Sequence, residues 1–406
     1  MVEQLRTQRY SRSRVRRCDE STTEVFWRQT AVMPRSLDPS PHGAADLSPV
    51  VERARRVADE VLFPTAQDVD RADHVPEDNF AALADAGLFG VAGPRSHGGL
   101  DLDAVAARRA IAAVGSGCGA TFFVWVQHHG AVRTLRASRN ELLVESLLAD
   151  LCSGRLLAGT AFAHVRRSGP PAVTATPVDG GWRIEGHAPW ATSWGIADWF
   201  TIAAVSDEGD LVWSLVPGRS PQGVTATPLA LPVFGATGTV ALDFEGCVVP
   251  DDRVIAVESV EAWRRVDRRH ASIGQPAVLG VAERAQRLLA GHADDLVAST
   301  SGALAEQLRQ CWEVDTDLVT ALGRGDDVIA EASDHRASCL DLARRATTAL
   351  LCAVGGRGMD LGHPAQRLAR EADFYVIQAQ TADGRAATLR SVARGQPPRR
   401  GDVGSE

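Results

Sequence analysis

The sequence of 406 residues predicts an α+β protein in three consecutive parts: an N-terminal α-helical domain (49–155), a central β-barrel or sandwich domain (156–258) and a C-terminal four-helix bundle (259–394). Two observations predict this order. Apolar residues recur every three or four positions in the first and last parts, which is the spacing of an amphipathic helix. The middle part instead contains short runs of β-branched and aromatic residues separated by turns, which is typical of strands.

The N-terminal part begins with three segments of helical spacing, VVERARRVADEVLF, NFAALADAGLF and DAVAARRAIAAV. Glycines interrupt the pattern after the second segment and indicate a loop there. The next segment, ATFFVWVQHHGAVRTL, is apolar on most sides, which indicates a buried helix.

The central part contains six segments that we expect to be strands: LLAGTAFA, AVTATPV, GWRIEGH, WFTIAAV, LVWSLVP and TVALDFEG. In the C-terminal part, helical spacing predicts helices over 262–292, 301–322, 328–354 and 364–392. Four helices with short connections favour an antiparallel bundle.

Both ends of the chain differ from the rest. Residues 1–48 include RTQRYSRSRVRR, which has six arginines and little apolar surface to bury. We favour a disordered leader, or a true start at Met33, over a basic arm for an anionic partner. Residues 395–406 are expected to form a flexible tail.

Composition excludes several classes of function. A formal net charge of −8 argues against general nucleic-acid binding, and no apolar run is long enough to span a membrane. The seven cysteines are scattered without a C-x-x-C pair, which argues against a disulfide framework or a metal site and fits the cytoplasm. All 43 basic residues are arginines, so lysine Schiff-base chemistry is excluded.

Four segments in the same order and spacing resemble motifs of the acyl-CoA dehydrogenase family: AGLFGVAGPRSHGGLDLD, DGGWRIEGHAPWATSWGIADWF, FEGCVVPDDRVI and GGRGMDLGHPAQRLAREA. The resemblance extends from about residue 55 to 392. It implies an acyl thioester substrate and an FAD site between the β-domain and the bundle. It also implies a homodimer or homotetramer that completes the flavin site across subunits.

The resemblance implies a set of cofactor-binding residues. An indole face can pack on the isoalloxazine ring and a threonine hydroxyl can bond its polar edge, although both side chains also suit a plain strand. A diglycine lets the backbone approach a dinucleotide, although glycines also end helices. The residues are Trp190, Thr192, Ser193, Gly355, Gly356 and Thr381.

A loop after the first strand is the candidate substrate-binding segment. Where the family has T-E-P and then a G-S-D loop, this chain has Ala163-His164-Val165 and a shorter loop. Arg166, Arg167 and Ser168 could bind a phosphate of the thioester carrier, because guanidinium matches phosphate geometry. The two arginines are equally well explained as solvated surface residues.

The usual catalytic base is missing. Dehydrogenation requires a group that accepts the α-proton, and the family's glutamate in I-Y-E-G-T aligns with Ala379. Some members place the glutamate at the start of the bundle, where this chain has His270, which is the candidate base. His164 is a weaker candidate, and His128 and His129 are expected to be structural.

The family's R-x-x-F-G motif, which clamps the FAD pyrophosphate, is also missing, because AERAQRLLAGHADDLVAST leads directly into GALAEQLRQCWEVDTDLV. This leaves FAD, FMN or no flavin open. Three functions remain: a flavin oxidoreductase acting on an acyl thioester, a flavin-dependent monooxygenase supplied by a reductase, or a non-catalytic subunit paired with an intact homologue. We favour the first, with an electron acceptor that the sequence does not identify.

Overall fold

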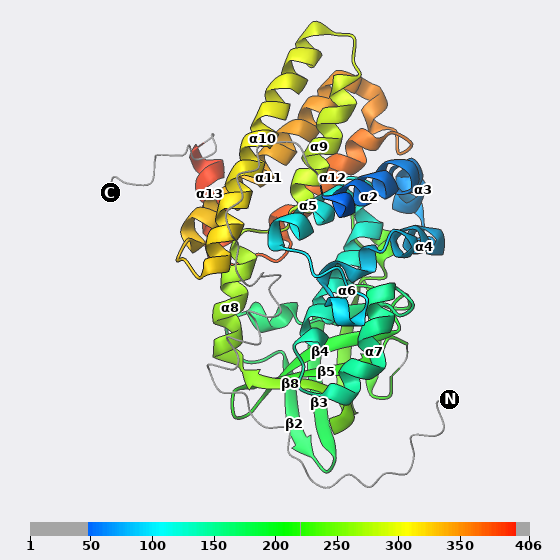
Figure 1. The fold of residues 1–406 in the computed structure, drawn as a ribbon, viewed down its shortest axis with the longest axis vertical. Coiled ribbons are helices and arrows are strands. Elements are labelled where there is room, and N and C mark those ends of the chain that lie inside the picture. Colours follow the sequence, from blue (N-terminus) through cyan, green and yellow to red (C-terminus); the bar gives the residue numbers. More distant parts are fainter. Residues whose placement is uncertain (1–47, 220, 395–406) are drawn as a thin grey trace.

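The computed structural model describes residues 48–219 and 221–394, so the predicted leader, apart from Ser48, and the predicted tail 395–406 lie outside the described residues. N-terminal helices, a central sheet and C-terminal helices follow one another along the chain (Figure 1). This confirms the predicted fold class. No helix in the described ranges is long and apolar enough to span a membrane.

The N-terminal part is entirely helical. Its longest helix, α6, is buried along most of its length, which explains the apolar composition of that segment. Asp103 and Asn140 cap the helices that they precede, since each side chain accepts a hydrogen bond from a backbone N–H of the first turn. The helices are α2 (Pro49–Val57), a π-helical segment (Ala58–Leu62), α3 (Phe63–Arg71), α4 (Glu77–Asp85), α5 (Ala104–Gly115), α6 (Gly119–Arg136) and α7 (Glu141–Ser153).

The central part is one eight-stranded sheet in the order β6-β7-β3-β2-β4-β5-β8, with β1 paired in parallel to β4. Each of the six segments expected to be strands contains one. The sequence did not predict β6 and β8. The strands are β1 (Ala158–Ala161), β2 (Val173–Val178), β3 (Gly181–Ala191), β4 (Trp199–Ser206), β5 (Asp210–Pro217), β6 (Val224–Pro228), β7 (Val240–Pro250) and β8 (Val254–Ser259).

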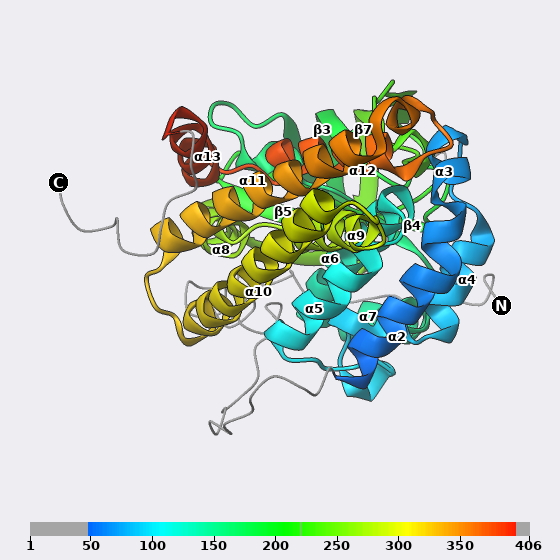
Figure 2. The same cartoon turned by 90° about the horizontal axis from the view of Figure 1, so that it is seen from above.

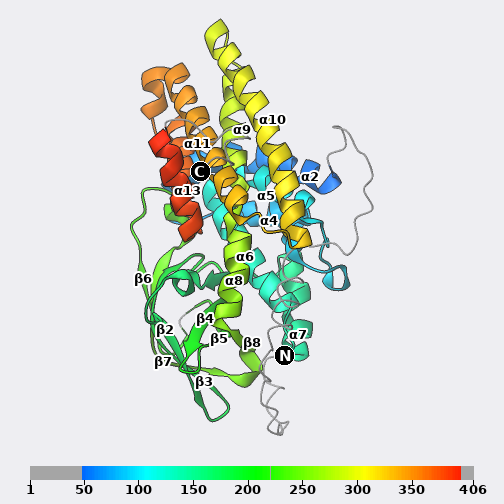
Figure 3. The same ribbon diagram turned by 90° about the vertical axis from the view of Figure 1, so that its left-hand side faces the viewer.

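In the C-terminal part, α9 to α12 pack alongside one another as a four-helix bundle (Figure 2). α8 leads from the sheet to the bundle, and α13 packs on α11 (Figure 3). Two predicted helices are each divided in two. Gly274, with φ of +71°, and Pro276 interrupt 262–292, while Ala379, with φ of +47°, lies in the break within 364–392. The helices are α8 (Val260–Ser272), α9 (Ala277–Ala290), α10 (Asp295–Arg324), α11 (Ile329–Val354), α12 (Pro364–Ile377) and α13 (Ala382–Arg394).

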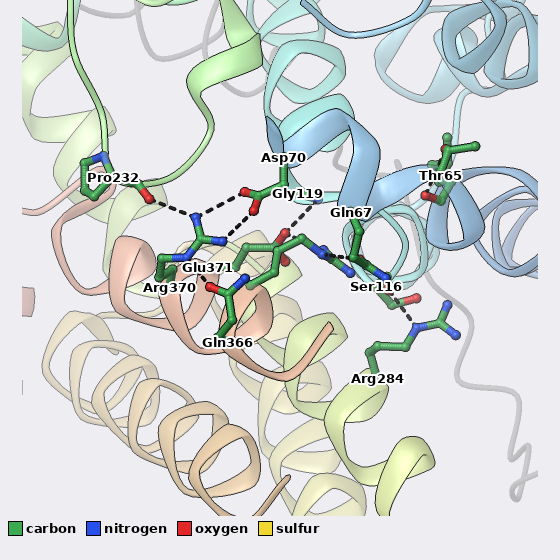
Figure 4. Close-up of polar contacts among 12 residues, drawn as sticks. Thr65, Gln67, Asp70, Ser116, Gly119, Pro232, Arg284, Gln366, Arg370 and Glu371 are labelled. Carbon is green, nitrogen blue, oxygen red and sulfur yellow. Dashed lines mark hydrogen bonds and ion pairs between the residues drawn. The ribbon is translucent and has the colours of Figure 1, made fainter. Parts of the chain in front are cut away.

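A buried polar network joins the N-terminal helices to the bundle (Figure 4). Arg370 of α12 forms an ion pair with Asp70 of α3. The next residue of the same helix, Glu371, accepts hydrogen bonds from the Gly119 backbone N–H at the start of α6 (3.2 Å) and from Arg367 one turn earlier (2.5 Å). Because Arg367 and Glu371 are buried, their bonds fix the position of α6 relative to the bundle.

Candidate functional site

A cavity of about 960 Å³ lies where the three parts of the chain meet. Its walls come from α5, α6 and α8, from strands β1 and β3, from the loop before residue 235, and from the turn between α12 and α13. The lining is largely apolar, and the volume is at the upper end of the range for sites that bind small molecules and cofactors.

Several residues singled out in the sequence line this one cavity, although they come from three different parts of the chain. Trp190 and Thr192 lie at the end of β3, Arg166 follows β1, His270 lies in the last turn of α8 and Ala379 lies in the turn after α12. The fold therefore brings the implied flavin contacts, the candidate base and the position of the missing base into a single space.

Trp190 presents an open aromatic face. Its side chain is 43% exposed, and within the described residues no other ring packs against it. A large apolar ring beside a cavity gains stability when a planar ligand covers it. This geometry suits stacking of a flat heteroaromatic ring.

Thr192 ends a chain of hydroxyl groups. Thr237 donates to the backbone oxygen of Phe234 (2.8 Å), and Thr239 lies 2.7 Å from Thr237 and 3.1 Å from Thr192. A hydroxyl has only one proton, so Thr239 donates to Thr237 and Thr192 donates to Thr239. The Thr192 oxygen therefore offers lone pairs to the cavity and can accept from an N–H group of a ligand.

His270 is neutral at pH 7. Burial lowers its pKa to about 4, and the positive charges of Arg133 and Arg269 lower the pKa further against the opposing effect of Asp267. The ring is half-buried and faces the cavity. It can accept a proton from a ligand, but with this pKa it is a weak base unless the charge around it changes.

Comparison with known proteins agrees with this architecture. The family model described as the acyl-CoA dehydrogenase N-terminal domain matches residues 45–155. A probable acyl-CoA dehydrogenase, fadE25 of Mycobacterium leprae, is 25% identical over 80% of this chain and 90% of its own. Benzylmalonyl-CoA dehydrogenase of Aromatoleum aromaticum is 27% identical over 81% and 92%. Residues 45–155 thus match the acyl-CoA dehydrogenase N-terminal domain, and the similarity to acyl-CoA dehydrogenases extends over most of the chain.

Solved structures show the same fold. Butyryl-CoA dehydrogenase of Megasphaera elsdenii superposes with a TM-score of 0.74 at 16% identity, covering 87% of this chain and 100% of that one. Glutaryl-coenzyme A dehydrogenase with glutaryl-CoA superposes with a TM-score of 0.73, also at 16% identity, covering 90% and 100%. At this identity the likeness concerns the fold alone.

The position at which this family usually has its glutamate is held rigidly. Ala379 has φ of +47°, which is unfavourable for a residue with a Cβ. The buried Arg336 donates to the backbone oxygens of Ala379 (3.0 Å), Gln378 (2.5 Å) and Ala271 (3.1 Å), which ties the turn to the end of α8. The side chain that this turn presents is a methyl group, so it cannot accept a proton.

Carboxylates elsewhere in the cavity are already engaged. Among the described lining residues these are Asp267 and Asp373. Asp267 receives two hydrogen bonds of 2.7 Å from Arg166, and Asp373 forms an exposed ion pair with Arg344. The same pairing occupies the guanidinium of Arg166, which the sequence suggested for phosphate binding.

Other predicted site residues lie outside the cavity, and their roles stay predictions. Arg167 and Ser168 are exposed on the loop after β1, and Gly355 and Gly356 are exposed beyond α11. Ser193 is buried with φ of +82°, Thr381 accepts from the N–H of Gly384 at the start of α13, and His164 is bonded to Ala203 O.

One residue that lines the cavity was not identified as a candidate from the sequence. Arg133, in the last turn of α6, faces the cavity and makes no hydrogen bond or ion pair with any described residue. The available signal was a single arginine inside the apolar run of α6. That signal is weak, because a sequence does not reveal whether an arginine has a partner.

Proposed function

We propose that the protein is a flavin-dependent oxidoreductase that acts on an acyl thioester inside this cavity. The observation that supports the proposal is the meeting of Trp190, Thr192, His270 and the Ala379 turn around one space. We further propose a homodimer or homotetramer.

The residues present fit a flavin ring. Trp190 offers a face for the isoalloxazine, and Thr192 offers an acceptor for a ring N–H. When bound, the flavin supplies a two-electron acceptor for hydrogen removed from the substrate. The apolar walls exclude water, and His270 is the candidate acceptor of the substrate α-proton, since the lining carboxylates are paired.

A non-catalytic subunit is the second candidate. Ala379 provides no carboxylate, and only residues 291–294 separate α9 from α10, where the family has its flavin clamp. In this role the chain would pair with an intact homologue, and the cavity would take up no flavin.

The test is flavin binding by the purified full-length protein. We expect a visible flavin spectrum as purified or after titration with FAD or FMN, with the released molecule identified by mass. Trp190→Ala should weaken flavin binding at least tenfold, because it removes a stacking surface that is 43% exposed. Trp194→Ala is the matched control, since Trp194 packs on Phe200 within the sheet and does not line the cavity.

A protein that is colourless and takes up neither FAD nor FMN would overturn the proposal in favour of the subunit role. Equal weakening in the two tryptophan variants would show that Trp190 contributes to folding alone.

A further inference from the structure

Arg133 is a cation without a counter-ion inside the cavity. The residue is half-buried and lines the cavity, and desolvation lowers its pKa to about 10, so the group is still charged at pH 7. Within the described residues it has no hydrogen bond, no ion pair and no aromatic ring beneath it.

The other arginines that line the cavity show how this protein normally accommodates such a charge. Each is held by two hydrogen bonds to one aspartate: Arg108 by Asp315, Arg166 by Asp267 and Arg370 by Asp70. Arg133 is the exception among the described lining arginines. The lack of a partner is therefore specific to Arg133 and is not a general feature of arginines in this cavity.

Arg133 is half-buried, and leaving such a charge unpaired carries a desolvation cost. The cost is recovered when a ligand supplies the anion. A guanidinium presents parallel N–H groups that match the two oxygens of a carboxylate. We propose that Arg133 binds a free carboxylate on the acyl group of the substrate, so that the substrate is the thioester of a dicarboxylic acid. This inference rests on the proposed function.

The surroundings favour a carboxylate on the acyl group over a phosphate of the thioester carrier. Phe162, Trp213 and Trp263 line the same cavity and pack with ring centroids 5.6–6.1 Å apart. These rings form an apolar wall that suits a short carbon chain, whereas a strongly hydrated phosphate is better placed at an exposed loop.

Binding there would also act on His270. The groups whose charges reach His270 are Arg133, Arg269 and Asp267. A carboxylate on Arg133 would offset the charge that lowers the His270 pKa, and the ring would become more basic when the correct substrate is bound. The same contact would thus select the substrate and make His270 a stronger base.

The first experiment compares binding of glutaryl-CoA, succinyl-CoA and butyryl-CoA to the full-length protein by calorimetry. We expect at least one of the two carboxylated thioesters to bind at least tenfold more tightly than butyryl-CoA. Arg133→Gln should remove this preference and leave butyryl-CoA binding unchanged. Arg139→Gln is the matched control, because Arg139 is exposed and does not line the cavity.

The second experiment titrates the His270 ring by NMR in the presence of free glutarate or butyrate. Glutarate should raise the His270 pKa, butyrate should not, and Arg133→Gln should abolish the difference. If neither carboxylated thioester binds more tightly than butyryl-CoA, this inference fails while the proposed function stands. If no thioester binds and no flavin is taken up, the proposed function fails. A His270 pKa that is insensitive to glutarate would also overturn the role of Arg133.

Discussion

His128 predicts a measurable acid sensitivity of the fold. Its ring is fully buried in α6, where Nε2–H donates to Leu151 O (3.1 Å) and Nδ1 accepts from the Ala158 N–H (3.2 Å). The two bonds coexist only in the neutral ring. In the protonated ring Nδ1 also carries a hydrogen, which would face the N–H of Ala158 and break that bond. Burial lowers the pKa of His128 to about 4.

The size of the stability change follows from the linkage between protonation of His128 and folding. In the unfolded chain the ring takes up a proton as the pH falls below about 6.5, whereas in the folded protein it does so only near pH 4. Stability is therefore lost as the pH falls through this window. The loss approaches about 3 kcal/mol below pH 4, and it is about 2 kcal/mol at pH 5 relative to pH 7.5.

The assay is urea unfolding, followed by circular dichroism at pH 7.5 and pH 5.0, of the native sequence and of His128→Gln. Glutamine has a donor and an acceptor but does not titrate in this range. We expect the native protein to lose about 2 kcal/mol more than the variant between the two pH values. Contributions from His164 and His270, whose pKa values are also lowered, do not involve His128, so they occur in both proteins and cancel. The charge of His128 also lowers the pKa of His129, so the His129 contribution is reduced in the variant and adds to the expected difference.

Thr121→Val is the matched control for this assay. Thr121 is buried in the same helix and accepts a hydrogen bond from Asn79 (2.8 Å), but it has no titratable group. This variant should lower stability equally at both pH values. Equal pH dependence in the native protein and His128→Gln would refute the reasoning.

Two further predictions concern buried arginines. Glu371→Gln removes the carboxylate that faces the buried Arg367, and we expect the free energy of unfolding to fall by about 3 kcal/mol in urea denaturation. Arg336→Met leaves the carbonyls of Gln378 and Ala379 without their donor, so we expect a loss of about 2 kcal/mol and faster hydrogen exchange in the turn between α12 and α13.

Each of these variants has an exposed counterpart. Asp68→Asn disrupts the surface ion pair with Arg71, and Arg390→Met disrupts the surface pair with Asp334. Exposed pairs contribute about 0–1 kcal/mol, so both controls should change stability little. If the controls lose as much free energy of unfolding as the buried variants, burial does not explain the effect of these arginine contacts.

Most of the fold was predictable from the sequence, because hydrophobic period distinguishes helices from strands over long segments. The misses have local causes. Strand β6 is partly exposed and lacks a strong apolar alternation. The break after α12 occurs at Ala379, and alanine is a strong helix former whose positive φ is imposed by tertiary bonds from Arg336.

The site was predictable to a smaller extent. Trp190 and Thr192 were found because the resemblance aligned a whole segment, and they do line the cavity. Arg133 was not found, since its significance lies in the absence of a partner. That property depends on how α6 packs against the sheet and which elements surround the cavity, which no local pattern encodes.

The charge of the cavity bears on the choice between an enzyme and a non-catalytic subunit. Three of its arginines are neutralised by aspartates, while Arg133 is not paired within the described residues. In a subunit without a ligand-binding role, an apolar side chain at this position would be more stable than a half-buried, unpaired cation. Stability given up at a cavity wall is typical of sites that bind ligands. The unpaired charge therefore favours a cavity that binds an anionic substrate.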